Sequence, residues 1–246
     1  MKKYFLVLLI TGSIAACNSN NKSTEEKKET KTETSTIVQT IVNSPLLGSF
    51  VGSFGTNKIT LLITKVIGDT VEGRSVVGGN DRPFSGFATL ANGVYSIKAK
   101  EPGDDKYDGE FSITFDEKNT NAISGSWTPF KEGAHGGAKN FSLTRNSFKY
   151  LVDVGQYPQA SKRLLKEDDV ANMMKEELEI MRNEIFARHG YCFKKKHLRE
   201  QFEDKDWYIP NSVEIKDDLT EIEKKNIALI KKYEKYAEEY GNDFGR

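Results

Sequence analysis

Apolar and polar residues alternate in short runs between residues 45 and 148, and Gly, Asn and Asp separate the runs. In 84–90, 111–115 and 123–127, every second residue is apolar or glycine, so one face of each run can meet a core. The pattern is typical of half-buried β-strands and has almost no helical periodicity. It predicts about eight strands, at 48–54, 59–66, 70–77, 84–90, 94–100, 109–116, 122–128 and 140–145.

Turn residues indicate how these strands connect. Asn92-Gly93 is the sharpest hairpin signal, because both central positions of a type I′ turn need positive φ. Short connections favour antiparallel neighbours, and closing an eight-strand meander removes both exposed edges. We therefore favour a small up-and-down barrel of the lipocalin or streptavidin kind for residues 45–148, with an open β-sandwich as the alternative.

The pattern changes to a helical period after a connector at 149–165. Val170, Met173, Leu178, Met181 and Ile185 are among the apolar residues that form one stripe along a predicted helix at 168–188. A glycine at 190 is placed to end that helix. A shorter helix is expected at 194–202, and Thr220-x-x-Glu223 is a capping box that starts a third, up to 240. The fold class is α+β multidomain: an all-β antiparallel domain, then a small helical domain at 166–240 and a tail at 241–246.

The amino terminus has the organisation of a secretory signal, with Lys2 and Lys3 before a short apolar run and small residues before Cys17. The run is too short to span a bilayer, which takes about 20 residues. Its Ile-Ala-Ala-Cys ending resembles the bacterial lipobox. The resemblance implies that residues 1–16 are removed as a lipoprotein signal peptide and that Cys17 carries diacylglycerol; the alternative is an ordinary signal with a chance cysteine. It also implies that Asn18 directs the protein to the outer membrane. Residues 17–44, rich in Asn, Ser, Thr, Lys and Glu, are expected to be a disordered tether.

Charge and cysteine content exclude several classes of protein. The chain has 36 basic and 36 acidic residues, so it offers neither the basic face that nucleic acid requires nor a polybasic membrane patch. Only two cysteines occur. With Cys17 lipidated, no intrachain disulfide is possible, and Cys192 is expected to be a small buried apolar residue.

The helical part carries the most specific motif, Met181 to Phe193 (MRNEIFARHGYCF), continued by Trp207-Tyr208-Ile209-Pro210-Asn211 and by 219–226. This series resembles the YARHG domain, a small bacterial module named for its Tyr-Ala-Arg-His-Gly core. Phe186 stands where the name-giving tyrosine would be, and Cys192 stands where an apolar residue is expected. The resemblance implies an exported envelope or cell-surface module without established catalysis.

Two interpretations of this motif are open. In the structural one, Glu184 pairs with Arg188 at i, i+4, and a polar network holds the Gly190 turn against Trp207 and Tyr208. In the functional one, the motif is a recognition surface for sugar or peptide, in which aromatic rings stack on the ligand and arginine binds an anion. The candidate ligand-binding residues are Arg182, Asn183, Arg188, His189, Tyr191, Trp207 and Tyr208.

Metal and catalytic chemistry are not expected. His189, Cys192 and His197 are too loosely spaced for four-coordinate zinc, and the acidic stretch 101–109 does not have EF-hand spacing and is better explained as a hairpin turn. No nucleophile elbow, zinc-protease motif or phosphate loop occurs. We expect no metal, no cofactor and no catalytic residue.

Three functions follow as hypotheses. The preferred one is a non-enzymatic envelope lipoprotein, anchored in the membrane by its lipid, whose helical domain binds peptidoglycan or a surface glycan. The alternative is a barrel that binds a small ligand, with Phe50, Phe54, Phe84, Phe111, Phe115 and Trp127 either lining a cavity or filling it. The third is an envelope hydrolase whose site is assembled from distant residues. The sequence names no protein partner.

Overall fold

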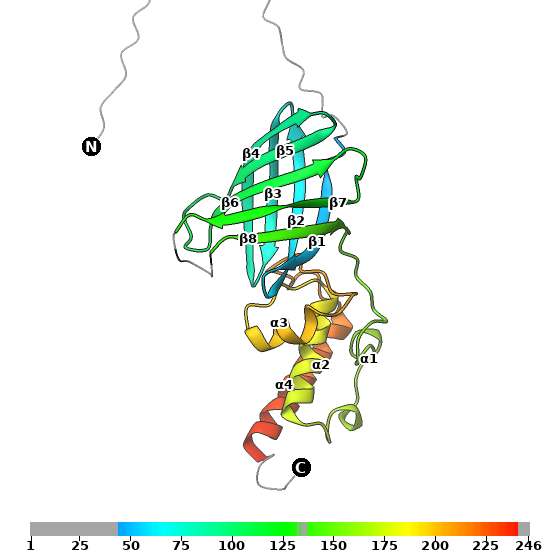
Figure 1. The fold of residues 1–246 in the computed structure, drawn as a ribbon. Helices are drawn as coiled ribbons and strands as arrows, with labels where there is room; N and C mark the ends of the chain where they lie inside the picture. The colour runs from blue at the N-terminus through cyan, green and yellow to red at the C-terminus, as the bar shows by residue number, and fades with distance from the viewer. Residues whose placement is uncertain (1–43, 132, 134–136, 241–246) are drawn as a thin grey trace, which may run out of the picture. The chain divides into compact units, whose positions relative to one another are not determined.

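The computed structural model describes residues 44–131, 133 and 137–240 (Figure 1). The predicted signal peptide at 1–16, Cys17, the tether up to residue 43 and the tail at 241–246 lie outside the described residues. The expectations about them stay predictions.

Eight strands form a closed barrel, so the expected barrel is confirmed and the open sandwich is wrong (Figure 1). Each strand pairs antiparallel with its neighbours in the chain, and β1 pairs with β8 through Phe50 opposite Arg145 and Val51 opposite Thr144. The strands are β1 (Gly48–Phe54), β2 (Asn57–Ile67), β3 (Thr70–Val77), β4 (Asn80–Ala91), β5 (Val94–Lys100), β6 (Gly109–Asp116), β7 (Ala122–Pro129) and β8 (Lys139–Arg145).

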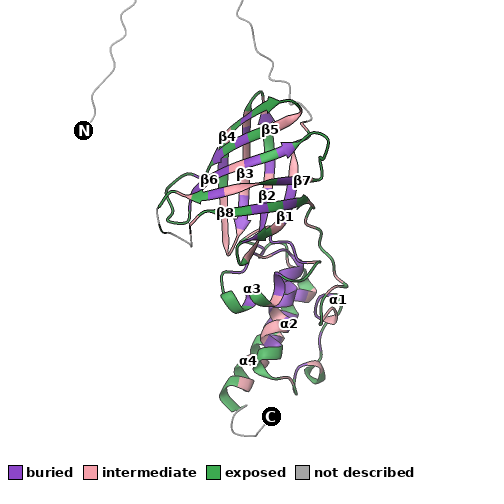
Figure 2. Cartoon of the chain, viewed as in Figure 1, coloured by how far each residue is buried: buried purple, intermediate pink, exposed green. Residues whose placement is uncertain are grey.

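Aromatic side chains occupy the barrel interior, and three of them, Phe54, Phe111 and Trp127, also line a cavity at one end of the barrel. Buried and exposed positions alternate along the strands (Figure 2), as the period-two pattern predicts. The six aromatic residues proposed to line or fill the interior are at most 4% exposed and belong to one cluster. Their rings contact one another, with 5.8 Å between the centroids of Phe54 and Trp127 and 5.7 Å between those of Phe84 and Phe111.

Turn chemistry sets the ends of the strands where the sequence indicated it. Asn92 and Gly93, between β4 and β5, have φ of 53° and 78°, as the predicted hairpin requires. In the acidic stretch between β5 and β6, the Asp108 carboxylate accepts N–H bonds from Gly103 and Asp105 and two from the Arg82 guanidinium. Burial of Asp108 opposes its ionisation, but these bonds outweigh burial and lower its pKa. The stretch is therefore a turn that the hydrogen bonds of the Asp108 carboxylate stabilise.

The helical region has four α-helices and one 3₁₀ turn among the described residues: α1 (Gln159–Lys162), η2 (Glu167–Asp169), α2 (Lys175–Arg188), α3 (Lys196–Phe202) and α4 (Glu221–Tyr240). Leu178, Met181 and Ile185 of α2 pack against Ile227 and Ile230 of α4. The predicted capping box starts α4: Thr220 N–H donates to Glu223, whose own N–H donates to the Thr220 hydroxyl. None of the described helices is both long enough and apolar enough to cross a bilayer.

The predicted helix at 168–188 is wrong in its first third, since α2 begins only at Lys175. The Glu177 carboxylate accepts the Met174 N–H at 2.8 Å and so starts the helix there. Val170 is nevertheless fully buried in the core, which it reaches from the turn after η2. The apolar stripe therefore identified the core face correctly and misplaced the start of the helix.

The segment expected to be a connector, 149–165, is packed onto the helices. Asn226 of α4, 1% exposed, accepts the Leu165 N–H at 2.8 Å and donates to the carbonyls of Ala160 and Arg163, both at 2.7 Å. A buried side-chain amide satisfied on both sides fixes the path of the backbone around it. The helical domain therefore incorporates this segment.

Direct hydrogen bonds join the barrel to the helical domain. Lys58 of β2 donates its backbone N–H to Glu203 at 2.9 Å and its ammonium to the carbonyls of Lys205 and Tyr208. Arg199 of α3 donates to the Asn57 side chain at 2.9 Å. These contacts place α3 and the loop after it against the β1–β2 end of the barrel.

Candidate functional site

The Arg-His-Gly part of the motif lies inside the helical domain. The Arg188 side chain, 1% exposed, donates Nε to the Val154 carbonyl at 2.9 Å and Nη1 to the Ser161 hydroxyl at 3.0 Å, and its Nη2 pairs with Glu184. The Glu184 carboxylate also accepts the Tyr157 N–H at 3.0 Å. The predicted i, i+4 pair is thus present, and it is used to bind the segment that precedes the helices.

Glu223 is the second centre of this network. Its Oε2 accepts from Thr220 and lies 2.9 Å from His189 Nε2, and its Oε1 accepts the Tyr150 hydroxyl at 3.1 Å. The Tyr150 and His189 rings are stacked, with centroids 4.5 Å apart. Burial of Glu223 disfavours its charge, but hydrogen bonds from His189, Thr220 and Ser161 outweigh it and lower its pKa to about 2.

The turn after α2 is held by its own backbone. Gly190, with φ of 70°, ends the helix as predicted, and its carbonyl accepts the Asn211 N–H at 2.8 Å. The hydroxyl of Tyr208, a residue with no exposed surface, donates to the Tyr191 carbonyl at 2.8 Å. This is the polar network that the structural interpretation describes. Arg188, His189 and Tyr208 are its buried parts, at most 7% exposed.

A groove of about 650 Å³ lies between α2, residues 191–198 and residues 213–219. Three of the candidate ligand-binding residues line it, Arg182, Asn183 and Tyr191. Its apolar part is formed by Phe186, Tyr191, Phe193, Leu198, Val213, Ile215 and Leu219, and its charged part by Glu179, Arg182, Lys194, Lys195, Glu214 and Lys216.

Aromatic rings form the apolar floor of the groove. Tyr191 packs edge-on against Phe186, with centroids 6.2 Å apart, and against Phe193, at 5.1 Å. Phe193 in turn stacks on Phe202 of the buried cluster behind it, at 5.1 Å. The floor therefore packs against a buried aromatic cluster, while Tyr191 and Phe186 are only half-buried.

The rim of the groove is basic. Four cationic residues line it against two acidic ones, Glu179 and Glu214. Arg182 is already engaged, since its Nε donates to both carboxylate oxygens of Glu234 of α4, at 2.9 and 3.0 Å. Lys194 and Lys216 are exposed and form no ion pair within the described part of the chain. The rim therefore has positive charge available to an anion.

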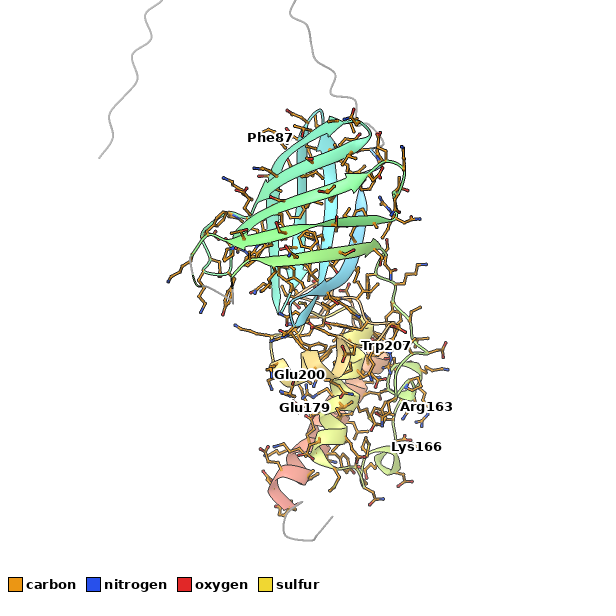
Figure 3. The ribbon with its side chains drawn as sticks, viewed as in Figure 1. Phe87, Arg163, Lys166, Glu179, Glu200 and Trp207 are labelled. Atoms are coloured by element: carbon orange, nitrogen blue, oxygen red, sulfur yellow. The ribbon has the colours of Figure 1, made fainter. Side chains whose placement is uncertain are left out.

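Asn183 lines the groove but contributes little exposed surface, and Trp207 lies outside the groove. Asn183, 4% exposed, donates to the Glu179 carbonyl one turn earlier, at 2.8 Å. Trp207 follows α3 (labelled in Figure 3) and packs against Phe202 and Tyr208, with centroids 6.3 and 6.4 Å away. It is half-buried and does not line the groove.

The three residues considered for zinc have separate partners. His189 faces Glu223, His197 lies 3.3 Å from Glu179, and the Cys192 sulfur accepts the Gly79 N–H at 3.1 Å. Over the described ranges, no group of three His, Cys, Asp or Glu side chains is placed to hold a metal ion. Burial raises the pKa of the Cys192 thiol to about 12, which fits the expected buried apolar residue.

Several groove residues were not anticipated from the sequence. Val213, Ile215 and Lys216 follow Pro210 in a stretch that lies outside every helix and strand predicted from the sequence. They reach the groove because Tyr191 forms a parallel bridge with Ser212, and Cys192 N–H donates to the Ser212 carbonyl at 2.8 Å. The short alternation Val213-x-Ile215 was the available signal.

The structure defines a two-domain protein. One domain is a closed antiparallel barrel, and the other is a helical domain whose groove has an aromatic floor and a basic rim. The helical domain is a YARHG domain, because residues 156–235 match that family. The match begins within the segment expected to be a connector. Neither the curated proteins nor the solved structures contain a match to the chain.

Proposed function

We propose that the protein is a non-enzymatic, lipid-anchored component of the bacterial cell envelope, and that its YARHG domain binds a cell-wall or surface polymer through the groove beside α2. The ligand is a segment of peptidoglycan or surface glycan that carries carboxylates. The observation that carries the proposal is the combination of a half-buried aromatic floor with lysines that have no acidic partner among the described residues.

The two parts of the groove suit two parts of such a polymer. The exposed faces of Tyr191 and Phe186 can pack against the apolar face of a sugar ring or a short peptide. Lys194 and Lys216 can pair with its carboxylates, and charge-assisted hydrogen bonds of this kind are stronger than neutral ones.

The proposed anchor follows from the lipobox-like ending at Cys17. A lipid on Cys17 would hold the protein at a membrane surface, and the 17–44 segment would let the folded part reach a polymer at some distance from it. If the lipobox resemblance holds, Asn18 would direct the anchored protein to the outer membrane.

The test is co-sedimentation of the detergent-purified full chain with purified peptidoglycan, and in parallel with outer-membrane fractions that carry surface glycan. We expect saturable binding to one of the two. The exchange Lys216→Glu should weaken binding about threefold to tenfold, because it replaces attraction by repulsion at the rim.

Lys231→Glu is the matched control, since Lys231 is equally exposed but lies on α4 outside the groove lining. It should leave binding unchanged. Absence of binding to both fractions, or equal losses in the two variants, would refute the groove as the binding site.

A further inference from the structure

A second cavity lies at the end of the barrel that faces α3. It has a volume of about 570 Å³ and combines residues of β1, β3, the β5–β6 turn and β8 with Lys194 and Arg199 of the helical domain. The volume is within the roughly 300–1,000 Å³ of small-molecule sites. This cavity does not belong to the groove described above, although Lys194 lines both.

A buried carboxylate forms part of the wall. Glu101, 6% exposed, accepts the Ser75 hydroxyl on Oε1 at 2.7 Å, and on Oε2 it accepts the Gly109 N–H at 2.8 Å and the Trp127 indole N–H at 3.0 Å. A carboxylate oxygen has about two acceptor positions, so Oε1 retains capacity for another donor. Burial raises the pKa of Glu101. The side chain is fixed in place and offers an acceptor to a hydroxyl in the cavity.

Positive charge surrounds this acceptor. Lys139 of β8 lies over the Phe54 and Trp127 rings, with Nζ 4.8 and 5.2 Å from the two centroids. It forms no ion pair with any described carboxylate, and burial lowers its pKa. Lys106, Lys194 and Arg199 also line the cavity, against Glu101 and Asp105. A half-buried lysine stabilised only by aromatic rings gains from an anion beside it.

Polar amides complete the lining. The Asn57 side chain accepts a hydrogen bond from Arg199 of α3, which connects the helical domain to the barrel mouth. Asn80, at the start of β4, also lines the cavity. Side-chain amides both donate and accept, which suits a ligand rich in hydroxyls. Neutral apolar ligands suit the cavity less well, because much of its lining is charged or carries amide groups.

We propose that the barrel mouth is a binding site for a small acidic sugar, with its carboxylate or phosphate beside Lys139 and its hydroxyls facing Glu101 and Asn80. The site is separate from the YARHG groove, so its failure would leave the proposed function untouched, and the reverse holds as well.

The experiment is isothermal titration of the full chain with D-glucuronate, glucose 6-phosphate and D-glucose. We expect saturable binding of at least one of the two acidic sugars and at least about tenfold weaker binding of D-glucose, a ratio that corresponds to one lost charge-assisted contact. The comparison of the two acids shows whether carboxylate or phosphate is preferred.

Three variants locate the site. Lys139→Gln should weaken binding of the acidic sugar about tenfold, and Lys139→Arg should retain most of it because the charge remains. Lys118→Gln, in the exposed β6–β7 turn at the opposite end of the barrel, should change nothing. Thermal unfolding of each variant establishes that it is folded.

The proposal would be overturned by no saturable binding of either acid, by D-glucose binding as tightly as the acids, or by an affinity that Lys139→Gln leaves unchanged in a folded protein. Loss of acidic-sugar binding in Lys216→Glu would place the ligand in the groove instead and would also overturn it.

Discussion

The imidazole Nε2 of His189 lies 2.9 Å from Oε2 of Glu223, and the two side chains are only 7% and 0% exposed. Together with Arg188 and Glu184 they form the interior of the YARHG domain, so the motif that gives the family its name contributes here to folding. Binding, as proposed, is left to the neighbouring groove.

Acid should destabilise the protein through Glu223. Its pKa of about 2 in the folded protein is below the ordinary 4.5, so its stabilising contribution is complete at neutral pH. That contribution is lost as pH falls from about 5 towards 2, and it is on the order of 3 kcal/mol. Glu223→Gln should lower the free energy of unfolding by about 2–3 kcal/mol at pH 7 and differ less from wild type at pH 3. Urea unfolding at the two pH values measures this.

The control for that experiment is Glu221→Gln. Glu221 lies in the same turn of α4 but is exposed and pairs only with Lys224. Its urea midpoint should stay close to wild type at both pH values. A Glu223→Gln variant as stable as this control would contradict the assigned role of the buried carboxylate.

Arg188 should not tolerate lysine. The three guanidinium nitrogens donate hydrogen bonds to Val154, Ser161 and Glu184, one nitrogen to each residue. The single nitrogen of a lysine ammonium cannot reach all three acceptors. We expect Arg188→Lys to lower the free energy of unfolding by about 2–3 kcal/mol, because the charge remains but at least one buried acceptor loses its hydrogen bond.

Arg163→Lys is a suitable comparison for this variant, because Arg163 makes a two-bond contact with Asp169 at an exposed position, with both N···O distances at 2.7 Å. Exposed pairs contribute little. Equal destabilisation of the two variants, measured by chemical unfolding, would show that burial does not set the importance of Arg188.

A methyl group at Gly190 should disrupt the turn after α2. An added Cβ would lie 2.8 Å from Cε2 of Phe148 and 2.9 Å from Cβ of Asn211, at a backbone φ of 70°. Gly190→Ala should therefore cost about 3 kcal/mol or more, from overpacking and backbone strain together. Gly68 has a similar φ of 60°, but an added Cβ there would meet no atom within 4 Å. Gly68→Ala therefore measures the cost of backbone strain alone, about 1 kcal/mol. Thermal unfolding separates the two, and similar melting temperatures would contradict the steric argument.

Cys192 should be unreactive in the folded protein. Its thiol is 1% exposed, and burial raises its pKa to about 12, so almost no thiolate forms at neutral pH. Iodoacetamide at pH 8 should label the Cys192 peptide only after unfolding in urea, as mass spectrometry can show. Rapid labelling of the native protein would mean that the contact between Cys192 and Gly79 opens readily.

Cys17 should carry the lipid of the proposed anchor. In a bacterial host fed labelled palmitate, the wild-type chain should become labelled and partition into the membrane fraction. Cys17→Ala should lose both properties, whereas Cys192→Ala should keep them. Label that persists in Cys17→Ala would reject the lipoprotein assignment.

Most of the secondary structure was predictable from local pattern. Alternation in Phe111-x-Ile113-x-Phe115 identified β6, and Asn92-Gly93 located the hairpin between β4 and β5, because strand period and turn dihedrals are properties of adjacent residues. The start of α2 was missed for an equally local reason. An apolar stripe runs through Val170 into the helix, but the Glu177 carboxylate caps Met174 and sets the boundary.

The candidate site was predictable only in part. Arg182, Asn183 and Tyr191 line the groove, but the wall that contains Ile215 and Lys216 could not be inferred, since it depends on the bridge between Tyr191 and Ser212. The sequence also left open whether Arg188 faces a ligand or the interior, because a polar residue near a helix end suits both.

The sequence by itself determined the eight strands, the helix ends at Gly190 and Thr220, and the change from strand to helical pattern, all of which follow from interactions within a few residues. The tertiary structure decided the rest: closure of the barrel through Phe50 and Arg145, burial of the Arg-His-Gly motif, and the shapes of the groove and the barrel mouth. Those features depend on contacts between residues tens of positions apart, and a side chain is committed to the interior or the surface only when the whole chain has packed.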